Sequence, residues 1–587
     1  MRTAALFLGL MGTAVCCFAI GPPPESGLLG QSEAVYFRIR PDIVDVPPVP
    51  AAVPPLGTCR ALVLLVDFVD QQASRIQHDT AFFGDKLFAA SPPSMRAYFE
   101  ENSYGQFILT GDVYGWFRST CRHDQFVNRD RYPGTADDYG LDTSPDALDS
   151  GICESPMNVW GLVQQTVLLA DETVDFAAYD NDGPDGIPHS DDDDGLVDAL
   201  FIVHAGPGAE IFGGMITGVD YIWSMQSDLD SYAPTRGTSA DGVGIGPFVI
   251  VPEMGEIGVY AHEFCHLLGL PDLYNSETGA SVVGPFCLMG EGAWNGPMGK
   301  AGSVPCHLSA PMKYFLGWVA PPEVCLGCEG PAEMPDAQIG ALGTSSKPYR
   351  VLANPNGVDW SATGGGRGEY FMLSNRQSRY GYFEAYLPTS GLLIWKVDES
   401  RPNNNDPSRR LAEIIQADGG RVDPGMPDSQ IPGDASDVWP GSLDKQAFTP
   451  TTVPASNLSG DRFSGVAIED ITQLGYGTVT ANIRVGVPRK GRTYAFPNPY
   501  NPDKASSMRI VFVPDPGPDV PYGFTVRVFD LEGNLIRTLD SGSEVPGDGT
   551  ALWDARDEAG NRIDPGLYFY SAESSGQHAT GTIAIVK

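Results

Sequence analysis

The stretch that most constrains this chain runs from His262 to His266 and reads His-Glu-Phe-Cys-His. Histidines four residues apart lie on one face of an α-helix, so both imidazoles can reach the same metal ion. Glu263, between them, is placed to take a proton from water activated at that ion. The motif predicts a helix from about Glu256 to Leu268 that carries a zinc site.

The residues after this helix offer a third ligand. Gly269 suits a sharp helix end, because glycine enters left-handed conformations at little cost. The chain can then turn back and deliver Asp272, and three protein ligands with one open position are typical of a catalytic zinc. Glu291 is a rival third ligand, but it requires more assumptions about folding. The simpler alternative, two surface histidines on an amphipathic helix, does not account for the Gly269 and Asp272 extension.

The length and charge of the chain exclude some classes of partner. A chain of 587 residues is expected to form three or four domains. The net charge of −37 argues against binding to nucleic acid or to an anionic membrane, because contacts with phosphate need clustered Lys and Arg.

The beginning of the chain is typical of an exported protein. Residues 1–19 are predicted to be a signal peptide, with Arg2 ahead of an apolar run that is too short for a membrane anchor. A lipoprotein signal at Cys16 or Cys17 is disfavoured, because Val and Cys precede them where Gly or Ala is usual. Residues 20–58 are rich in proline and are predicted to be a linker or a short pro-segment.

Three structural regions are predicted after residue 58. Apolar strands at 61–68 and 196–203, with helices near 94–105 and 256–268, predict an α/β domain over 59–329. Short apolar runs such as 391–397, separated by Gly, Pro and Asp, predict a β-rich domain over 330–487. The alternating runs 526–530 and 535–539 predict a β-sandwich over 488–587.

An acidic loop is a second candidate metal site. Asp180, Asp182, Asp194 and Asp198 alternate with glycines, as in loops that bind calcium through hard oxygen ligands. No glutamate closes a twelve-residue EF-hand, and a solvated acidic loop is the alternative. His204 follows a predicted buried strand and receives no role.

The cysteines are compatible with disulfides, since eight remain outside the first 19 residues of an exported chain. Cys265 and Cys287 are predicted to come close enough for a disulfide, with two small buried thiols as the alternative. Cys325 and Cys328 have the spacing of half a zinc ribbon, but no second pair follows.

Several segments resemble the immune inhibitor A-like secreted metallopeptidases, a branch of the metzincin group. The resemblance extends over about 60–487 and is carried by residues 258–264, 270–274, 287–296 and 307–318. It implies a zinc endopeptidase with Glu263 as general base, His262, His266 and Asp272 as ligands, and Met289 in a turn beneath the histidines. Cys265 departs from the pattern, because such enzymes commonly carry glycine there.

The C-terminal region carries a second resemblance. Residues 496–502, 526–539, 553–557 and 566–570 resemble the immunoglobulin-like module of flagellar-hook-cap and type IX secretion sorting domains. This resemblance implies export, with secretion machinery or a cell surface as a partner of residues 488–587. A spacer sandwich without a sorting role is the alternative.

The sequence thus predicts a secreted zinc endopeptidase that acts on proteins or peptides. The main alternative is a cell-surface adhesion or scaffold protein with an inactive peptidase domain, and the complete set of His262, Glu263, His266 and Asp272 argues against it. An amidase that uses the same zinc is a third possibility. The segment before residue 59 is short for a folded inhibitory prodomain, so any latency would depend on a residue such as Asp42 or Asp45.

Overall fold

The computed structural model describes most of the chain from residue 51 onward, and the backbone of β1 (Cys17–Ala19). The described ranges are 51–127, 156–183, 187–191, 193–212, 221–232, 235–326, 328–354, 357–358, 360, 368–421, 431–475, 477–486, 492–496, 498–503, 507–513, 524–540, 550–574 and 577–587. The predicted signal peptide, apart from β1, and residues 20–50 of the predicted pro-segment lie outside these ranges.

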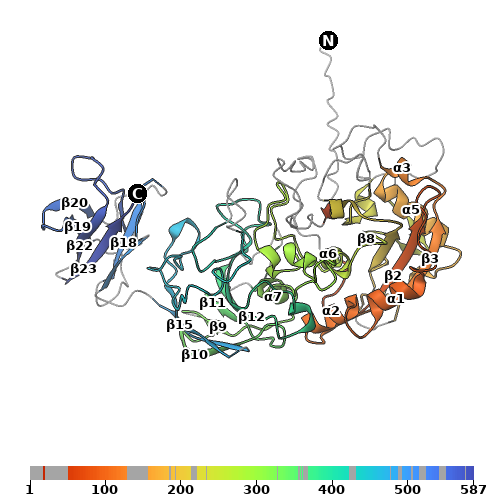
Figure 1. The fold of residues 1–587 in the computed structure, drawn as a ribbon, viewed down its shortest axis with the longest axis horizontal. Coiled ribbons are helices and arrows are strands. Elements are labelled where there is room, and N and C mark those ends of the chain that lie inside the picture. The colour runs from red at the N-terminus through yellow and green to blue at the C-terminus, as the bar shows by residue number, and fades with distance from the viewer. Residues whose placement is uncertain are drawn as a thin grey trace, which may run out of the picture.

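A six-stranded sheet forms the frame of the N-terminal half, in the order β1-β5-β8-β4-β2-β3 (Figure 1). Strands β2, β3, β4 and β8 are parallel, whereas β5 runs antiparallel to β8 and β1 runs antiparallel to β5. The bounds are β2 Gly57–Asp67, β3 Phe107–Arg118, β4 Leu200–His204, β5 Met225–Asp228 and β8 Pro247–Pro252. A small β6 (Ser239–Ala240) and β7 (Val243–Gly244) hairpin precedes β8.

Helices cover both faces of this sheet, as an α/β fold requires. In β2, Val63 and Leu65 belong to one core while Leu64 and Val66 belong to another, because successive side chains of a strand point to opposite faces. The first core includes residues of α1 (Thr80–Phe88), α2 (Met95–Asn102) and α6 (Ile257–Leu267), and the second those of α5 (Val159–Ala170). A short α3 (His123–Phe126) follows β3.

Local capping explains where the predicted helices begin and end. Ser94 caps α2 by accepting a hydrogen bond from the backbone N–H of Ala97. Gly269 follows α6 with φ +84°, the left-handed conformation expected of a glycine at a helix end. Both helices therefore match the sequence expectation, whereas β4 begins at Leu200, four residues later than expected.

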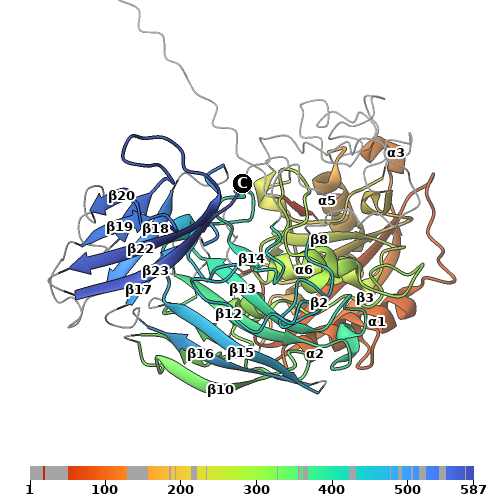
Figure 2. The same cartoon turned by 60° about the vertical axis from the view of Figure 1, so that its left-hand side comes forward.

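Two further sheets pack against each other over residues 323–485. One has the order β14-β13-β12-β11-β9 and the other β10-β16-β15 (Figure 2). Their bounds are β9 Glu323–Val324, β10 Glu333–Gly340, β11 Tyr349–Val351, β12 Glu369–Arg376, β13 Gly391–Asp398, β14 Ala412–Ile414, β15 Val466–Leu474 and β16 Thr478–Val485. We call this part the β-rich module, as the sequence predicted.

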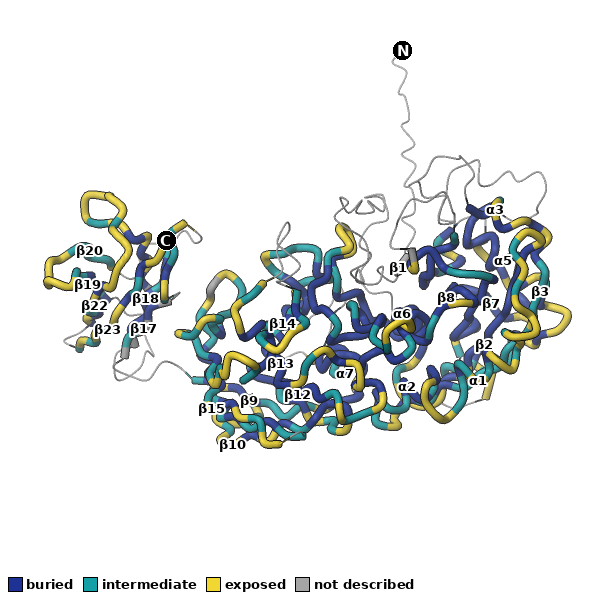
Figure 3. Tube along the Cα trace, viewed as in Figure 1, coloured by how far each residue is buried: buried dark blue, intermediate teal, exposed yellow. Residues whose placement is uncertain are grey.

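The β-rich module shares a core with the first sheet. On β12, Phe371 and Leu373 face the β10-β16-β15 sheet, whereas Tyr370 and Met372 belong to the same core as α6. Trp395 of β13 joins Tyr370 in this shared core. Buried segments accordingly run without a break from the region of α6 to β12 and β13 (Figure 3).

The C-terminal residues form a separate β-sandwich, at the left of Figure 1. Its sheets have the orders β17-β18-β21 and β20-β19-β22-β23, and its core shares no residue with the others. The bounds are β17 Arg492–Phe496, β18 Met508–Val513, β19 Thr525–Phe529, β20 Leu535–Asp540, β21 Thr550–Trp553, β22 Gly566–Ser574 and β23 Gln577–Ile585. A search of the described helices finds none with the length and apolarity needed to span a membrane.

Candidate metal centre

Helix α6 and the turn after it bring the predicted ligands together. Oδ1 of Asp272 lies 3.0 Å from Nε2 of His262 and 3.6 Å from Nε2 of His266. One ligand atom of each residue lies within 4.8 Å of the other two, and all three side chains are buried. Glu291 begins the 3-10 helix η6 (Glu291–Trp294) and does not belong to this group.

The chemistry of this group suits zinc. Two imidazoles and one carboxylate are a common ligand set of catalytic zinc sites. Nε2 of His262 and Oδ1 of Asp272 face each other, are buried, and have no hydrogen-bond partner within the part of the chain that the structure describes, which is costly unless a cation lies between them. Burial lowers the pKa of His266 to about 4 against the opposing charge of Asp272, so this ring stays in its neutral, metal-binding form.

Backbone carbonyls orient both rings. Nδ1 of His262 lies 3.1 Å from the carbonyl oxygen of Leu288, and Nδ1 of His266 lies 2.7 Å from that of Leu270. A carbonyl oxygen only accepts hydrogen bonds, so each Nδ1 carries the proton and each Nε2 presents its lone pair. The ring orientation is therefore fixed by the protein before any metal binds.

Glu263 and Tyr274 lie beside the ligands. Glu263 is completely buried within α6. Burial raises the pKa of Tyr274 well above its ordinary value, with contributions from both Asp272 and Glu263, so the hydroxyl lies near both carboxylates. The Tyr274 ring also stacks on His262, with ring centroids 6.5 Å apart. Tyr274 received no role from the sequence, although it belongs to the segment 270–274 that carries the family resemblance.

The turn at Met289 contacts both ligand-bearing segments. Met289 is fully buried, and its carbonyl accepts a hydrogen bond of 2.7 Å from the N–H of Leu273. Its neighbour Leu288 supplies the carbonyl that holds His262. The turn is therefore tied to both the Asp272 segment and His262, and its place beneath the metal-bound histidines stays a prediction.

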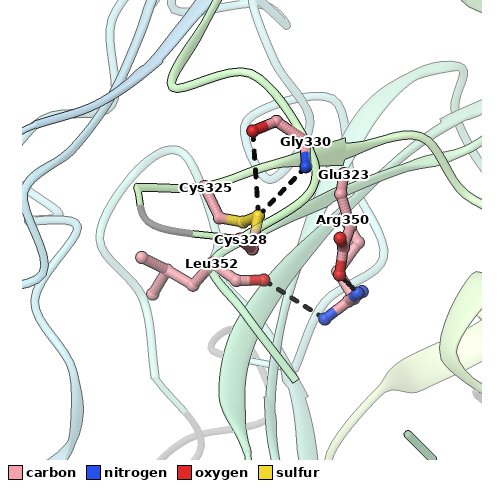
Figure 4. Close-up of a disulfide and its surroundings, with 6 residues drawn as sticks. All are labelled: Glu323, Cys325, Cys328, Gly330, Arg350 and Leu352. Atoms are coloured by element: carbon pink, nitrogen blue, oxygen red, sulfur yellow. Dashed lines mark hydrogen bonds and ion pairs between the residues drawn. A yellow bond between two sulfur atoms is a disulfide. The ribbon is translucent and has the colours of Figure 1, made fainter. Parts of the chain in front are cut away.

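The structure contradicts one cysteine prediction and shows how the Cys325 and Cys328 pair is arranged. Cys265 and Cys287 are buried free thiols, so the predicted disulfide between them is wrong. Cys325 and Cys328 are joined in a disulfide and offer no thiolates to a zinc ribbon (Figure 4). Cys328 also accepts a hydrogen bond of 3.3 Å from the N–H of Gly330.

The acidic loop gathers a slightly different set of carboxylates from the one predicted. Asp180, Asp182 and Asp193 offer oxygens within 4.8 Å of one another. Asp198 and Asp194 lie beside them, and backbone N–H groups donate hydrogen bonds to all five carboxylates. Nδ1 of His189 also lies 2.7 Å from Oδ2 of Asp180. Burial and the neighbouring aspartates raise the pKa of Asp198 to about 8, a sign of concentrated negative charge.

His204 is buried at the end of β4. It lies two residues after Ile202 and so on the same face of the strand, the face covered by α5. Burial lowers its pKa to about 3, so the ring is neutral. Its Nδ1 lies 3.2 Å from the carbonyl oxygen of Ala205. The structure therefore places His204 on the opposite face of the sheet from α6.

The segment that carries this geometry is similar to known proteins. Residues 57–319 match the family described as "Immune inhibitor A peptidase M6, catalytic domain", and residues 518–578 match the FlgD Ig-like domain. Immune inhibitor A of Bacillus thuringiensis subsp. alesti is 30% identical over 289 residues, which cover 44% of this chain and 39% of that protein.

Other matches are more limited. The pre-pro-metalloprotease PrtV of Vibrio cholerae is 31% identical over 237 residues, which cover 38% of this chain and 23% of that protein. The chain thus spans well under half the length of these relatives. The solved structure of PorZ, a surface component of the type-IX secretion system of Porphyromonas gingivalis, is 15% identical, covers 38% of this chain and 22% of that chain, and has a TM-score of 0.14.

Proposed function

We propose that this chain, which carries a peptidase M6 catalytic domain at residues 57–319, is a secreted zinc endopeptidase that cleaves proteins or peptides. The observation that carries the proposal is the convergence of His262, His266 and Asp272, whose buried ligand atoms surround one point. The two histidines of α6, the aspartate after it and the turn at Met289 support a metzincin-like site.

The residues around this point account for hydrolysis of a peptide bond. Zinc, when bound, supplies a Lewis acid that lowers the pKa of water to about 7 and polarises a carbonyl group. The Glu263 carboxylate accepts a proton from the attacking water and then donates it to the nitrogen of the leaving amine. Its complete burial excludes bulk water, which strengthens its interaction with charge that develops in the transition state. Tyr274 stands close enough to Asp272 to hold that carboxylate in place.

Removal and replacement of the metal test this proposal. Dialysis against a chelator should abolish casein hydrolysis, and addition of one equivalent of Zn²⁺ should restore it. Mg²⁺ serves as the control, because it prefers oxygen ligands in octahedral geometry and should not restore activity. Hydrolysis that continues in the metal-free chain would contradict the proposal.

We further propose that the acidic loop binds calcium through Asp180, Asp182 and Asp193, with Asp194 and Asp198 in support. Ca²⁺ takes six to eight oxygen ligands. Three carboxylates this close together repel one another unless a cation lies between them. Saturating Ca²⁺ should raise the unfolding temperature of the parent and leave that of an Asp180→Asn, Asp182→Asn variant unchanged. An equal response of both proteins, or of neither, would refute calcium binding at this loop.

The C-terminal sandwich supports a proposal about location. Its match to the FlgD Ig-like domain and its separate core suit a module that acts independently of the peptidase unit. We propose that residues 488–587 attach the exported chain to secretion machinery or to a cell surface. Fractionation of cells that express the chain with and without these residues tests it, and an unchanged distribution would contradict it.

A further inference from the structure

A buried ion pair in the β-rich module lies against the metal centre. Arg376 ends β12, and Glu384 lies in the 3-10 helix η7 (Tyr382–Glu384). Nε of Arg376 is 2.6 Å from Oε2 of Glu384, Nη2 is 2.5 Å from Oε1, and neither residue is exposed. A two-pronged arginine–carboxylate contact of this kind fixes both groups in one geometry.

Both members of the pair also bind the backbone of the peptidase domain. Nη1 of Arg376 donates a hydrogen bond to the carbonyl oxygen of Phe286, three residues before Met289. Oε1 of Glu384 accepts a hydrogen bond of 3.1 Å from the N–H of His307. Burial alone would raise the pKa of Glu384, but the charge of Arg376 beside it holds that pKa below its ordinary value, so the pair is ionised.

A continuous run of hydrogen bonds leads from this pair to a predicted zinc ligand. The carbonyl of His307 accepts from the N–H of Leu288 at 3.3 Å, and the carbonyl of Leu288 accepts from Nδ1 of His262 at 3.1 Å. Two residues, His307 and Leu288, therefore connect Glu384 to the imidazole, each through its own N–H and C=O. Outer groups of this kind orient a metal ligand, so the position of the His262 ring depends on backbone segments that Arg376 and Glu384 hold in place.

The same module holds the segment that carries Asp272. Asn404, between β13 and β14, donates a hydrogen bond of 2.9 Å to the carbonyl of Leu273 and one of 2.8 Å to the carbonyl of Ala412. The N–H of Leu273 in turn binds the carbonyl of Met289. The β-rich module thus fixes the Met289 turn and the Asp272 segment together. Figure 2 shows β12 and β13 on the side of α6, with which they share a core.

We infer that Arg376 and Glu384 are positioning residues for the metal centre, so the peptidase site is complete only with the β-rich module. The inference rests on the proposed function in one respect, that His262 and Asp272 bind the metal. It extends the site by about 65 residues beyond the end of the matched catalytic domain, from residue 319 to residue 384.

The test uses the full chain and two variants. The Arg376→Met, Glu384→Gln double variant removes both charges, so no buried charge is left without its partner, and keeps an oxygen acceptor for the N–H of His307. Arg376→Lys keeps the charge but loses the planar fork that reaches Glu384 and Phe286 together. Ile468→Ala is the matched control, because Ile468 is fully buried in the core of the β-rich module and outside the hydrogen-bond run.

Three readouts are compared: zinc release to a chromogenic chelator, the unfolding temperature, and the kcat and KM of casein hydrolysis. We expect both ion-pair variants to release zinc about tenfold faster than the parent, which is the usual size of the effect when groups that orient metal ligands are changed. We also expect both variants to lower kcat by a larger factor than they change KM. Ile468→Ala should lower the unfolding temperature at least as much but release zinc at the parental rate.

Zinc release within twofold of the parent in both ion-pair variants would overturn the inference, as would equal acceleration in Ile468→Ala. If the double variant does not fold, Arg376→Lys alone decides in the same way. A parent that binds zinc but hydrolyses no protein would refute the proposed function, while the zinc-release comparison would still test the positioning role.

Discussion

At the scale of single residues, the orientation of two imidazoles determines what the site can do. His262 and His266 each bind a backbone carbonyl through Nδ1, so both present Nε2 to the point that Oδ1 of Asp272 also reaches. Ligands that are oriented before the metal binds reduce the entropy cost of metal binding. Glu263 is not needed as a ligand and remains available as a proton acceptor.

The identity of the third ligand gives the first prediction. Asp272→Asn should weaken zinc binding by more than about 100-fold, because loss of a ligand costs more than the 10–100-fold effect of its outer partners. Competition with a chelator of known affinity measures the change. Glu291→Gln is the control and should bind zinc like the parent, since Glu291 lies outside the ligand group. The reverse pattern would make Glu291 the ligand.

The residue-scale features that the sequence predicted are local ones. His262, Glu263, His266 and Asp272 lie within one helix and one turn, so helical periodicity and the preference of Gly269 for positive φ suffice to bring them together. Cys265 and Cys287 interact electrostatically but form no disulfide. Their positions in the chain could not show this, because sequence does not fix whether two buried sulfurs have the geometry of a bond.

At the scale of elements, α7 (Ala310–Phe315) carries a buried amine in a network of hydrogen bonds. Nζ of Lys313 is 3.1 Å from Nδ1 of His307 and 3.3 Å from the hydroxyl of Tyr104, and it has no exposed surface. Burial lowers the pKa of Lys313 to about 7, against attraction from Glu384. The protonated amine of Lys313 is therefore less stable in the folded chain than in the unfolded chain.

This lowered pKa predicts a pH dependence of stability. The unfolded chain holds the Lys313 proton up to about pH 10.4, whereas the folded chain releases it near pH 7. Since the unfolded state binds more protons between these values, the unfolding free energy should rise with pH, by roughly 2 kcal/mol from pH 7 to pH 9. Urea denaturation at several pH values isolates this contribution, because the unfolding free energy of Lys313→Met should rise by roughly 2 kcal/mol less than that of the parent from pH 7 to pH 9. Equal slopes in the two proteins would contradict the assignment.

Elements with strong local signals were predictable, and those that depend on distant contacts were not. Ser94 and Gly269 mark helix ends through capping, and the alternation in β19 and β20 marks a hairpin. In contrast, Arg376 and Glu384 lie far along the chain from Phe286 and His307, and no local pattern indicates that they meet. Which carboxylates of the acidic loop lie closest together likewise depends on how the loop folds. In the structure Asp193, rather than Asp194, groups with Asp180 and Asp182.

At the scale of the whole molecule, the peptidase domain and the β-rich module share one core, whereas the C-terminal sandwich has its own. Side chains such as Tyr370 and Trp395 fill the space next to α6. The predicted boundary at residue 329 therefore marks a change in secondary structure within a continuous core.

Truncation tests this division. A chain that ends at residue 486 should keep its casein hydrolysis and the unfolding temperature of its main transition, because the sandwich core is independent. A chain that ends at residue 329 loses the buried residues of β12 and β13 and should not unfold cooperatively. Calorimetry of both chains decides. A cooperative transition with full activity in the shorter chain would show that the first sheet folds and works alone.

The most direct test of the central claim is casein hydrolysis by the parent chain and by its Glu263→Gln variant, with the zinc content of both measured in the same preparations. The proposed roles predict one zinc per chain in each protein and turnover in the parent alone, lowered at least about 10²-fold in the variant, in line with loss of a general base. Parental turnover in Glu263→Gln, or a fully active parent without zinc, would contradict the account.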